Sequence, residues 1–324
     1  MKILQVHKFF YLSGGADRVF FDTSALLEKN GHTVLFFSMK HPKNFSCPFD
    51  QYFVSQSSYE NNTPGRCIMN AVNIIYSPEA RRNMDMLLSR HQPDIAHLHN
   101  IYHQLSPSIL HSLRHRSVPV VMTLHDYKMV CPAYSMLYNG KPCEACKGGA
   151  YQHCFLKACV NDSRNRSLLL TAEMFLHHKI MRIYDLVNVF ISPSLFLKNK
   201  LEEMGFPGRI VHLPNFVETG ALKPLYGGDG KTIVYLGRLS PEKGLTTLMD
   251  AVKGLTGISL NIIGGGPLKP FLEEKIKNEN IKNIFLPGYK SGYELRQEVE
   301  KAMFVVLPSE CYENNPRCIL EAFA

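Results

Sequence analysis

Two carboxylates near the end of the chain have a spacing that suits ligand binding. Glu313 and Glu321 lie eight positions apart beside an Asn-Asn-Pro turn. Pro316 fits the first turn of a helix, so we expect Glu321 about one and a half turns inside it and Glu313 on the loop before it. The apolar run 304–307 predicts a buried parallel strand, and open α/β sheets bind ligands where such strands end. The alternative is a solvated helix start with acids near its N-terminus.

A second predicted strand end carries two cations. The segment GRLSPEKG, 237–244, follows an apolar strand pattern at 232–236 and precedes a helical pattern at 245–252. Arg238 and Lys243 flank its Ser-Pro turn. A guanidinium binds phosphate as a fork and an ammonium binds it as a point charge, so this pair could grip two phosphates. Either charge alone would be an ordinary surface residue.

Two further features lie where strands end in the first half of the chain. Gly14 and Gly15 join the first strand to the first helix, where a backbone without side chains can approach an anion. The G-x-G-x-x-G fingerprint is absent here and at 264–267, so neither glycine turn predicts dinucleotide binding. His125 and Asp126 end the strand predicted at 118–124, and both could face a ligand. The alternative for Gly14 and Gly15 is an ordinary tight turn, and the alternative for His125 and Asp126 is a polar cap at the end of the strand.

The acidic D-x-D motif does not occur in the chain. Metal-dependent sugar transfer usually needs such a pair, so we expect no cofactor for catalysis, with Arg238 and Lys243 neutralising a leaving diphosphate. A group of cysteines that includes one C-x2-C pair has two interpretations. The cysteines could bind a structural zinc that plays no part in catalysis. Alternatively, they are free thiols in a packed loop. The candidate ligands are Cys131, Cys143, Cys146, Cys154 and Cys159.

Strand and helix patterns alternate along the chain and predict two doubly wound parallel sheets. The expected strands of the first sheet are 3–6, 33–37, 94–98 and 118–124, and those of the second are 232–236, 259–263, 283–286 and 304–307. A turn-rich linker follows residue 214 and includes 223–230. We place the boundary near residue 217, which gives an acceptor-side domain at 1–217 and a nucleotide-sugar-binding domain at 218–324, with a cleft between them.

Charge is unequal between the two predicted domains. Residues 1–218 contain 23 Lys and Arg against 16 Asp and Glu, a net charge of +7, and all 14 histidines. A basic face suits an anionic membrane or a phosphate-bearing acceptor, whereas the chain has no compact basic-aromatic module for nucleic acid. The basic stretch 164–182 could be a membrane-facing amphipathic helix, although a helix packed on the first sheet is favoured. No signal peptide or membrane-spanning run is seen, so we expect a cytoplasmic protein with reduced cysteines, either free or peripheral at the inner membrane face.

Five segments in order along nearly the whole chain resemble the retaining glycosyltransferases of family 4. They are GGADRV, TLHD, GRLSPEKG, IIGGGP and the terminal E-x7-E. The resemblance implies the GT-B fold, in which two Rossmann-like domains face a cleft. It also implies transfer of a sugar from a nucleotide-diphosphate sugar, commonly linked to UDP, to a lipid-linked or polysaccharide acceptor in cell-surface glycan synthesis. Retention would occur by front-face attack, with the departing phosphate taking the acceptor's proton.

The resemblance also implies roles for individual residues. Glu321 would hold the ribose hydroxyls, Glu313 would face the sugar hydroxyls, and His125 would contact the donor sugar. Asn314 and Asn315 would complete the sugar pocket, although Gly and Phe are commoner in the family at these positions. The remaining residues implied around the diphosphate and the base are Gly14, Gly15, Arg238, Lys243, Gly266, Tyr289 and Lys290.

The sequence ends at Ala324, inside the helix that should carry Glu321. By comparison with the family, we expect the second domain to be incomplete, without its last strand and without the helix that returns to the first domain. The rival functional reading is therefore a truncated, catalytically weak GT-B module that binds a nucleotide or a partner. A GT-B epimerase is a lesser alternative, because the order of the loops fits family 4 better.

Overall fold

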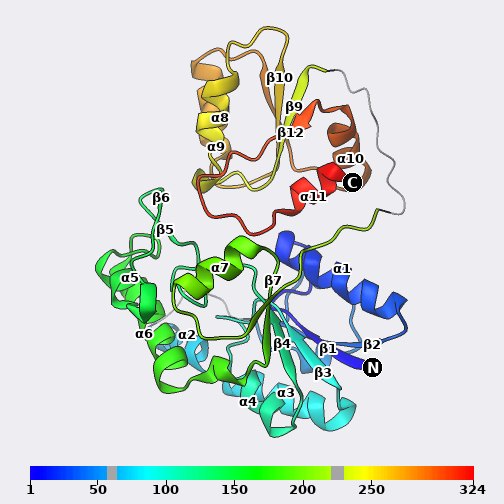
Figure 1. Cartoon of the computed structure of the whole chain (residues 1–324), viewed down its shortest axis with the longest axis vertical. Helices are drawn as coiled ribbons and strands as arrows, with labels where there is room; N and C mark the ends of the chain where they lie inside the picture. The colour runs from blue at the N-terminus through cyan, green and yellow to red at the C-terminus, as the bar shows by residue number, and fades with distance from the viewer. Residues whose placement is uncertain (57–63, 220–229) are drawn as a thin grey trace. The chain divides into compact units, whose positions relative to one another are not determined.

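The computed structural model describes residues 1–56, 64–219 and 230–324, and the chain divides into two compact units. The first unit contains residues 1–136 and 144–215, and the second contains residues 137–143 and 216–324 (Figure 1). The predicted linker segment 223–230 lies outside the described residues, apart from Gly230. We keep 1–217 and 218–324 as proposed domain ranges.

The first unit is built on a six-stranded parallel sheet in the order β2-β1-β3-β4-β7-β8. Since β1 lies between β2 and β3, the order of the strands reverses beside β1, which is where doubly wound sheets bind ligands. The strands of this sheet are β1 (Lys2–Val6), β2 (Thr33–Phe37), β3 (Ile95–Leu98), β4 (Val120–Thr123), β7 (Val189–Ser192) and β8 (Ile210–His212). The predicted parallel sheet is confirmed.

Helices follow the strands of the first unit, as a parallel sheet requires. Several begin at a serine whose hydroxyl accepts from a backbone N–H of the first turn, as Ser77, Ser163 and Ser194 do. The helices are α1 (Gly15–Lys29), α2 (Pro64–Ile75), α3 (Pro78–His91), α4 (Ile109–His115), α5 (Gln152–Leu156), α6 (Arg164–Phe175) and α7 (Leu195–Glu203).

The basic stretch 164–182 forms α6 and then a π-helical turn, Leu176–Ile180. α6 contacts α2 and α5 and buries Leu170 and Met174, while Leu168 and Phe175 stay exposed. The helix is therefore packed into its own unit through one face. Among the residues that the structure describes, no helix is long and apolar enough to span a bilayer.

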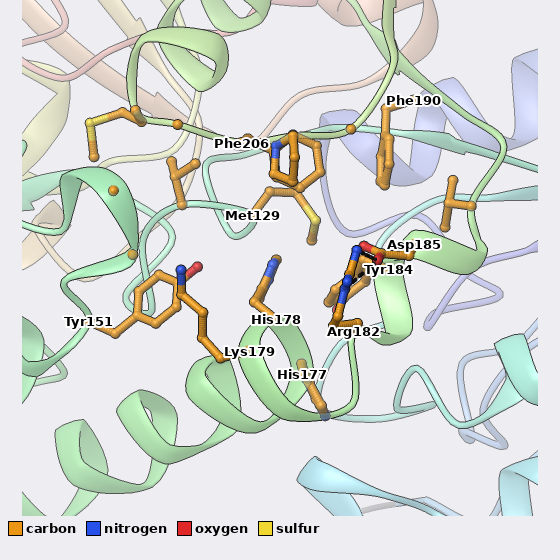
Figure 2. A pocket seen from close by; sticks show the side chains of 18 of the residues that line it. Met129, Tyr151, His177, His178, Lys179, Arg182, Tyr184, Asp185, Phe190 and Phe206 are labelled. Carbon is orange, nitrogen blue, oxygen red and sulfur yellow. Dashed lines mark hydrogen bonds and ion pairs between the residues drawn. The ribbon is translucent and has the colours of Figure 1, made fainter.

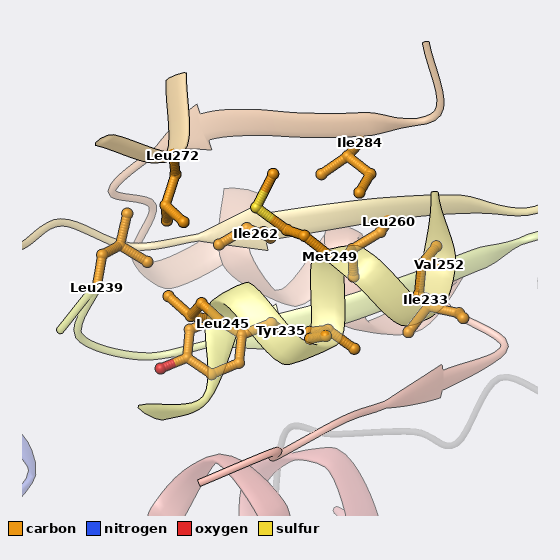
Figure 3. Packing of buried hydrophobic residues seen from close by; sticks show 11 residues of the cluster. Ile233, Tyr235, Leu239, Leu245, Met249, Val252, Leu260, Ile262, Leu272 and Ile284 are labelled. Atoms are coloured by element: carbon orange, nitrogen blue, oxygen red, sulfur yellow. The ribbon is translucent and has the colours of Figure 1, made fainter. Parts of the chain in front are cut away.

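The second unit has a four-stranded parallel sheet in the order β11-β10-β9-β12. Alternate residues of β9 enter two different cores: Ile233 and Tyr235 pack with α8 (Figure 3), whereas Val234 and Leu236 pack with α10. Helices therefore cover both faces of the sheet. The elements are β9 (Thr232–Leu236), α8 (Leu245–Val252), β10 (Ser259–Ile263), α9 (Lys269–Asn278), β11 (Ile284–Gly288), α10 (Gly292–Lys301), β12 (Phe304–Val305) and α11 (Arg317–Phe323).

Candidate functional site

Three loops meet at the carboxyl edge of the second sheet, following β9, β10 and β12. The backbone N–H of Gly237 donates to Ile263 O at 3.1 Å, and that of Leu239 donates to Gly265 O at 2.9 Å. The third loop joins through Glu310, whose N–H donates to Glu242 O at 2.9 Å. The backbone thus ties together the three loops that carry most of the predicted donor-binding residues.

Glycines let these loops approach one another closely. A Cβ added to Gly266 would lie 2.4 Å from Leu239 O on the first loop, and one added to Gly244 would lie 2.1 Å from Pro308 O on the third. Neither distance is possible for a real side chain. Gly244 also has a left-handed backbone, with φ +64°. Both glycines are therefore required by packing, whether or not Gly266 also contacts a phosphate.

Lys243 and Glu313 come together from two different loops. Lys243 Nζ lies 2.6 Å from Glu313 Oε1, and Ser309 Oγ donates to the same oxygen at 2.5 Å. Both charged side chains are about three-quarters buried. Burial lowers the pKa of Lys243, but the hydrogen bond and the charge of Glu313 outweigh it, so the pKa is raised. The ammonium is held charged beside its carboxylate.

Arg238 is exposed on the same loop as Lys243. Tyr235, from the preceding strand β9, holds this loop in place, because its hydroxyl donates to the carbonyl of Arg238 at 2.9 Å. Tyr235 is fully buried in the core of the second unit. Sequence reasoning missed this anchor, because Tyr235 occupies an ordinary inward position of an apolar strand.

Glu321 lies inside α11, as its fifth residue, whereas Pro316, which was expected in the first turn, is the N-cap of that helix. Arg317 Nη2 lies 3.4 Å from Glu321 Oε1, and Arg317 Nη1 donates to Phe216 O at 3.1 Å. Asn315, in the turn before the helix, has a left-handed backbone with φ +48°. Asparagine is among the residues that tolerate this conformation best, which suits its presence here.

The turn after β11 separates the two residues expected near the base. Tyr289 has 78% of its surface exposed. Lys290 instead forms an ion pair with Glu298 of α10, which also accepts from Asn261 Nδ2 at 3.0 Å. The aromatic ring is thus available to a ligand, while the ammonium is held against the neighbouring helix.

In the first unit, histidines lie at the ends of three neighbouring strands. His7 follows β1, His99 follows β3 and His125 follows β4. His125 Nε2 and His99 Nδ1 are 2.8 Å apart. Burial lowers the pKa of His125 to about 3, so this side chain is neutral near pH 7. Its neighbour Asp126 accepts from the hydroxyl of Tyr102 and from Lys128 N–H.

The predicted glycine turn is held by an aspartate that the sequence analysis missed. Asp17 Oδ2 accepts from Ser13 N–H at 2.8 Å, Ser13 Oγ at 2.6 Å and Gly14 N–H at 2.7 Å. Its other oxygen accepts from His7 Nε2 at 2.6 Å. The available signal was an acid in the first turn of a helix, where it satisfies unpaired N–H groups. A Cβ on Gly14 or Gly15 would meet nothing within 4 Å, so these positions are open.

The described residues do not assemble the predicted zinc site. Within residues 1–56, 64–219 and 230–324, no three His, Cys, Asp or Glu side chains are placed to hold a metal ion. Burial raises the pKa of Cys154 to about 12 and also raises that of Cys131, which favours protonated thiols. The side chains of Cys154 and Cys159 are hydrogen-bonded to each other, and Cys131 lies close enough to both to affect the pKa of Cys154.

A pocket of about 420 Å³ in the first unit lies away from the predicted strand-end residues (Figure 2). His178, from the π-helical turn, points into it between Tyr151 and Tyr184, and Phe206 and Met129 lie opposite. Of the predicted site residues it includes Cys146, and neither His125 nor the glycine turn lines it. We assign the candidate site to the strand-end loops rather than to this pocket.

Comparison with protein families matches nearly the whole chain to two models. Residues 13–221 match the model described as Glycosyltransferase Family 4, and residues 223–324 match Glycosyl transferases group 1. An uncharacterized glycosyltransferase of Methanocaldococcus jannaschii is 32% identical over 120 residues, and the 2-deoxystreptamine N-acetyl-D-glucosaminyltransferase of Niallia circulans is 31% identical over 99 residues. These alignments cover 37% and 29% of this chain, and 33% and 25% of the relatives' lengths.

Solved structures share the fold at low sequence identity. Sucrose-phosphate synthase from Thermosynechococcus elongatus has a TM-score of 0.67 at 16% identity, covering 99% of this chain and 78% of that one. Anabaena HepE has a TM-score of 0.57 at 15% identity, with the same coverage. TarM from S. aureus has a TM-score of 0.60 at 10% identity, covering 95% and 81% of the two chains. With its two Rossmann-like units and its matches to both family models, the chain belongs to glycosyltransferase family 4 and has the GT-B fold.

Proposed function

We propose that this protein transfers a sugar from a UDP-linked donor, with retention of anomeric configuration, to a lipid-linked or polysaccharide acceptor in cell-surface glycan synthesis. The observation that carries the proposal is the ion pair between Lys243 and Glu313. It joins two of the three strand-end loops that the backbone ties together. A cation for phosphate and a carboxylate for sugar hydroxyls therefore lie side by side in one unit.

The donor would bind by exchange of this ion pair. A diphosphate carries more charge than a carboxylate and would draw Lys243 away, with exposed Arg238 as its second cation. Glu313, released from Lys243, could then accept hydrogen bonds from sugar hydroxyls beside Asn314 and Asn315.

The other end of the donor would lie along α11 and the turn after β11. Glu321 would accept from the ribose hydroxyls, for which its oxygen would have to leave Arg317, 3.4 Å away. The exposed ring of Tyr289 would lie against the base, with Lys290 beside it. Gly266 would lie near the phosphates, next to the loop that carries Arg238.

In the proposed reaction the bond between the anomeric carbon and the diphosphate breaks, and a bond to the acceptor oxygen forms on the same face. The departing phosphate oxygen takes the acceptor's proton. Arg238 and Lys243 stabilise the charge that develops on the diphosphate. His125 and the glycine turn of the first unit would contact the donor as neutral groups.

Names of similar proteins support the choice of donor and acceptor. Anabaena HepE has been solved with UDP and glucose and with UDP-glucose. TarM has been solved with UDP and α-GlcNAc-glycerol, and another structure of this fold is a lipopolysaccharide outer core galactosyltransferase, WaaB.

The test is binding and hydrolysis of a panel of nucleotide sugars by the purified chain and by Glu321→Ala and Arg238→Ala variants. One donor should bind selectively, and both variants should lose it. Glu273→Ala, at an exposed acid of α9, is the matched control and should behave as the wild type. If the folded chain binds no nucleotide sugar, the proposal fails, and a covalent sugar trapped on Glu313 would overturn the front-face mechanism.

A further inference from the structure

A chain of hydrogen bonds crosses three neighbouring strands inside the first unit and ends at His125. It begins on β4, where Thr123 Oγ1 lies 2.7 Å from Nε2 of His97 on β3. Nδ1 of His97 lies 3.2 Å from the amide nitrogen of Gln5 on β1. Gln5 and His97 are register partners in the parallel ladder, which is why their side chains meet.

The same glutamine continues the chain toward the ligand-binding edge. Its amide oxygen lies 3.2 Å from Nε2 of His99, and Nδ1 of His99 lies 2.8 Å from Nε2 of His125. Gln5 and His99 are completely buried. The rings of His99 and His125 are stacked, with centroids 5.2 Å apart and planes 21° from parallel.

With the amide of Gln5 oriented as it is in the structure, the chemistry of the amide sets where each proton lies. Its NH2 only donates, so Nδ1 of His97 accepts and its Nε2 carries the hydrogen that goes to Thr123. The amide oxygen only accepts, so Nε2 of His99 carries a hydrogen and its Nδ1 accepts from His125. Hence all three rings are Nε2–H tautomers. Reversing the amide of Gln5 would convert all three to Nδ1–H.

We propose that Gln5 is a positioning residue that fixes His125 as the Nε2–H tautomer and so presents its Nδ1 as a hydrogen-bond acceptor to the ligand. Within the described residues, the bond to His99 is the only hydrogen bond of the His125 side chain. Its Nδ1 is not one of the buried polar atoms left without a partner, which leaves this nitrogen open to a ligand. The ligand group that meets this nitrogen must be a donor, and in a sugar that is a hydroxyl. This last step rests on the proposed function.

Burial and the nearby charge of Lys8 both keep the histidines of this network neutral. Burial lowers the pKa of His97 to about 4 and that of His99 well below its usual value. The charged groups facing His125 include Lys8, which disfavours a second positive charge, and Asp17, which is already bonded to His7. A neutral ring can accept at Nδ1, whereas an imidazolium could only donate.

The test uses the whole chain labelled with ¹⁵N at histidine, with each ring assigned by single His→Gln substitution. Long-range ¹H–¹⁵N spectra distinguish a protonated ring nitrogen from an unprotonated one. His97, His99 and His125 should each show a protonated Nε2 and an unprotonated Nδ1. In Gln5→Met, which keeps an unbranched side chain of similar size, His99 and His125 should lose this single tautomer.

Two controls separate positioning from a general structural role. Thr123→Val removes the far end of the chain but leaves the bonds from Gln5 through His99 to His125, so the tautomer of His125 should be unchanged. Gln51→Met alters an exposed glutamine and should change nothing. A protonated Nδ1 on His125 in the wild type, or an unchanged His125 in Gln5→Met, would overturn the proposal.

Kinetics tests the consequence for sugar transfer separately. Gln5→Met should lower kcat/KM for the selected donor on the order of tenfold, the effect of one oriented hydrogen bond, while Thr123→Val should stay near the wild type. The spectra do not depend on activity, so a chain that shows the tautomers but binds no nucleotide sugar would refute the proposed function and leave the role of Gln5 standing. An equal loss of activity in both variants would refute the role of Gln5 in transfer.

Discussion

At the scale of single residues, the Lys243–Glu313 ion pair makes a prediction that separates phosphate binding from sugar binding. Lys243→Met should weaken binding of the UDP-sugar by roughly 10- to 100-fold, because a hydrogen bond to a charged group contributes about 1.5–3 kcal/mol. Glu313→Gln should instead tighten binding of free UDP, since Lys243 no longer has a competing carboxylate. Titration calorimetry of both ligands measures these changes.

The matched control for this prediction is Lys253→Met, which removes an exposed lysine paired with Asp250 and Glu279. It should leave both affinities within about twofold of the wild type. If Lys243→Met and Lys253→Met weaken UDP equally, the effect is general electrostatics and Lys243 is not a phosphate ligand.

A second prediction concerns a buried ion pair in the first unit. Lys128 Nζ lies 2.7 Å from Glu173 Oε2, and both side chains are almost completely enclosed. Burial would raise the pKa of Glu173, but Lys128, His103 and His177 outweigh it and lower the pKa to about 2. Glu173→Gln should lower the free energy of unfolding at pH 7 by about 3 kcal/mol, because it leaves a buried ammonium without its counter-charge.

The pH dependence of this effect follows from the direction of the shift. A carboxylate whose pKa is depressed in the folded state stabilises the protein above its unfolded pKa of about 4.5, and that contribution is lost as the pH falls toward 2. The difference in unfolding free energy between wild type and Glu173→Gln should therefore shrink between pH 4.5 and pH 3. Urea denaturation across that range is the measurement, and a constant difference would contradict the assignment.

At the scale of elements, the close contact between the loops after β9 and β10 can be tested with two adjacent glycines. Gly266→Ala places a methyl group 2.4 Å from Leu239 O and should cost about 2 kcal/mol or more of stability. Gly265→Ala meets nothing within 4 Å and should stay within about 0.5 kcal/mol of the wild type. Thermal or urea unfolding of both variants decides the point, and equal stabilities would show that the loops are not in contact.

The same scale shows what the sequence could predict. Apolar runs placed four of the six strands of the first sheet and all four of the second, because strands buried on two faces are apolar throughout. They missed β7 and β8, and the run 304–307, predicted to be a buried strand, forms only the short edge strand β12, in which Phe304 is 47% exposed. They do not say which strands are neighbours, so the meeting of Gln5, His97 and His99 could not be foreseen. The cysteines show the same limit: a C-x2-C spacing fixes separation along the chain, whereas the contact between Cys154 and Cys159 is set by the fold.

At the scale of the whole molecule, the two compact units have separate sheets and separate cores. If the donor binds mainly through the loops of the second unit, with only His125 and the glycine turn contributed by the first, a UDP-sugar at 100 times its Kd should stabilise the second unit by about 2.7 kcal/mol. Scanning calorimetry should then show one transition that rises on the order of 10 °C and another that rises much less. The control is the Arg238→Ala variant, whose transitions should not respond. An equal rise of both transitions in the wild type would argue against a donor site formed mainly by the second unit.

If Lys243 binds the diphosphate of a donor, its ion pair with Glu313 would also select which anions can bind there. Any anion that reaches Lys243 must replace a carboxylate that already lies 2.6 Å from it. Chloride, acetate and other singly charged ions offer the lysine no stronger partner than the one it has, whereas a diphosphate does. Under the proposed role of Lys243, the preference for a diphosphate over monovalent anions should therefore exceed what the positive charge of the lysine alone would give.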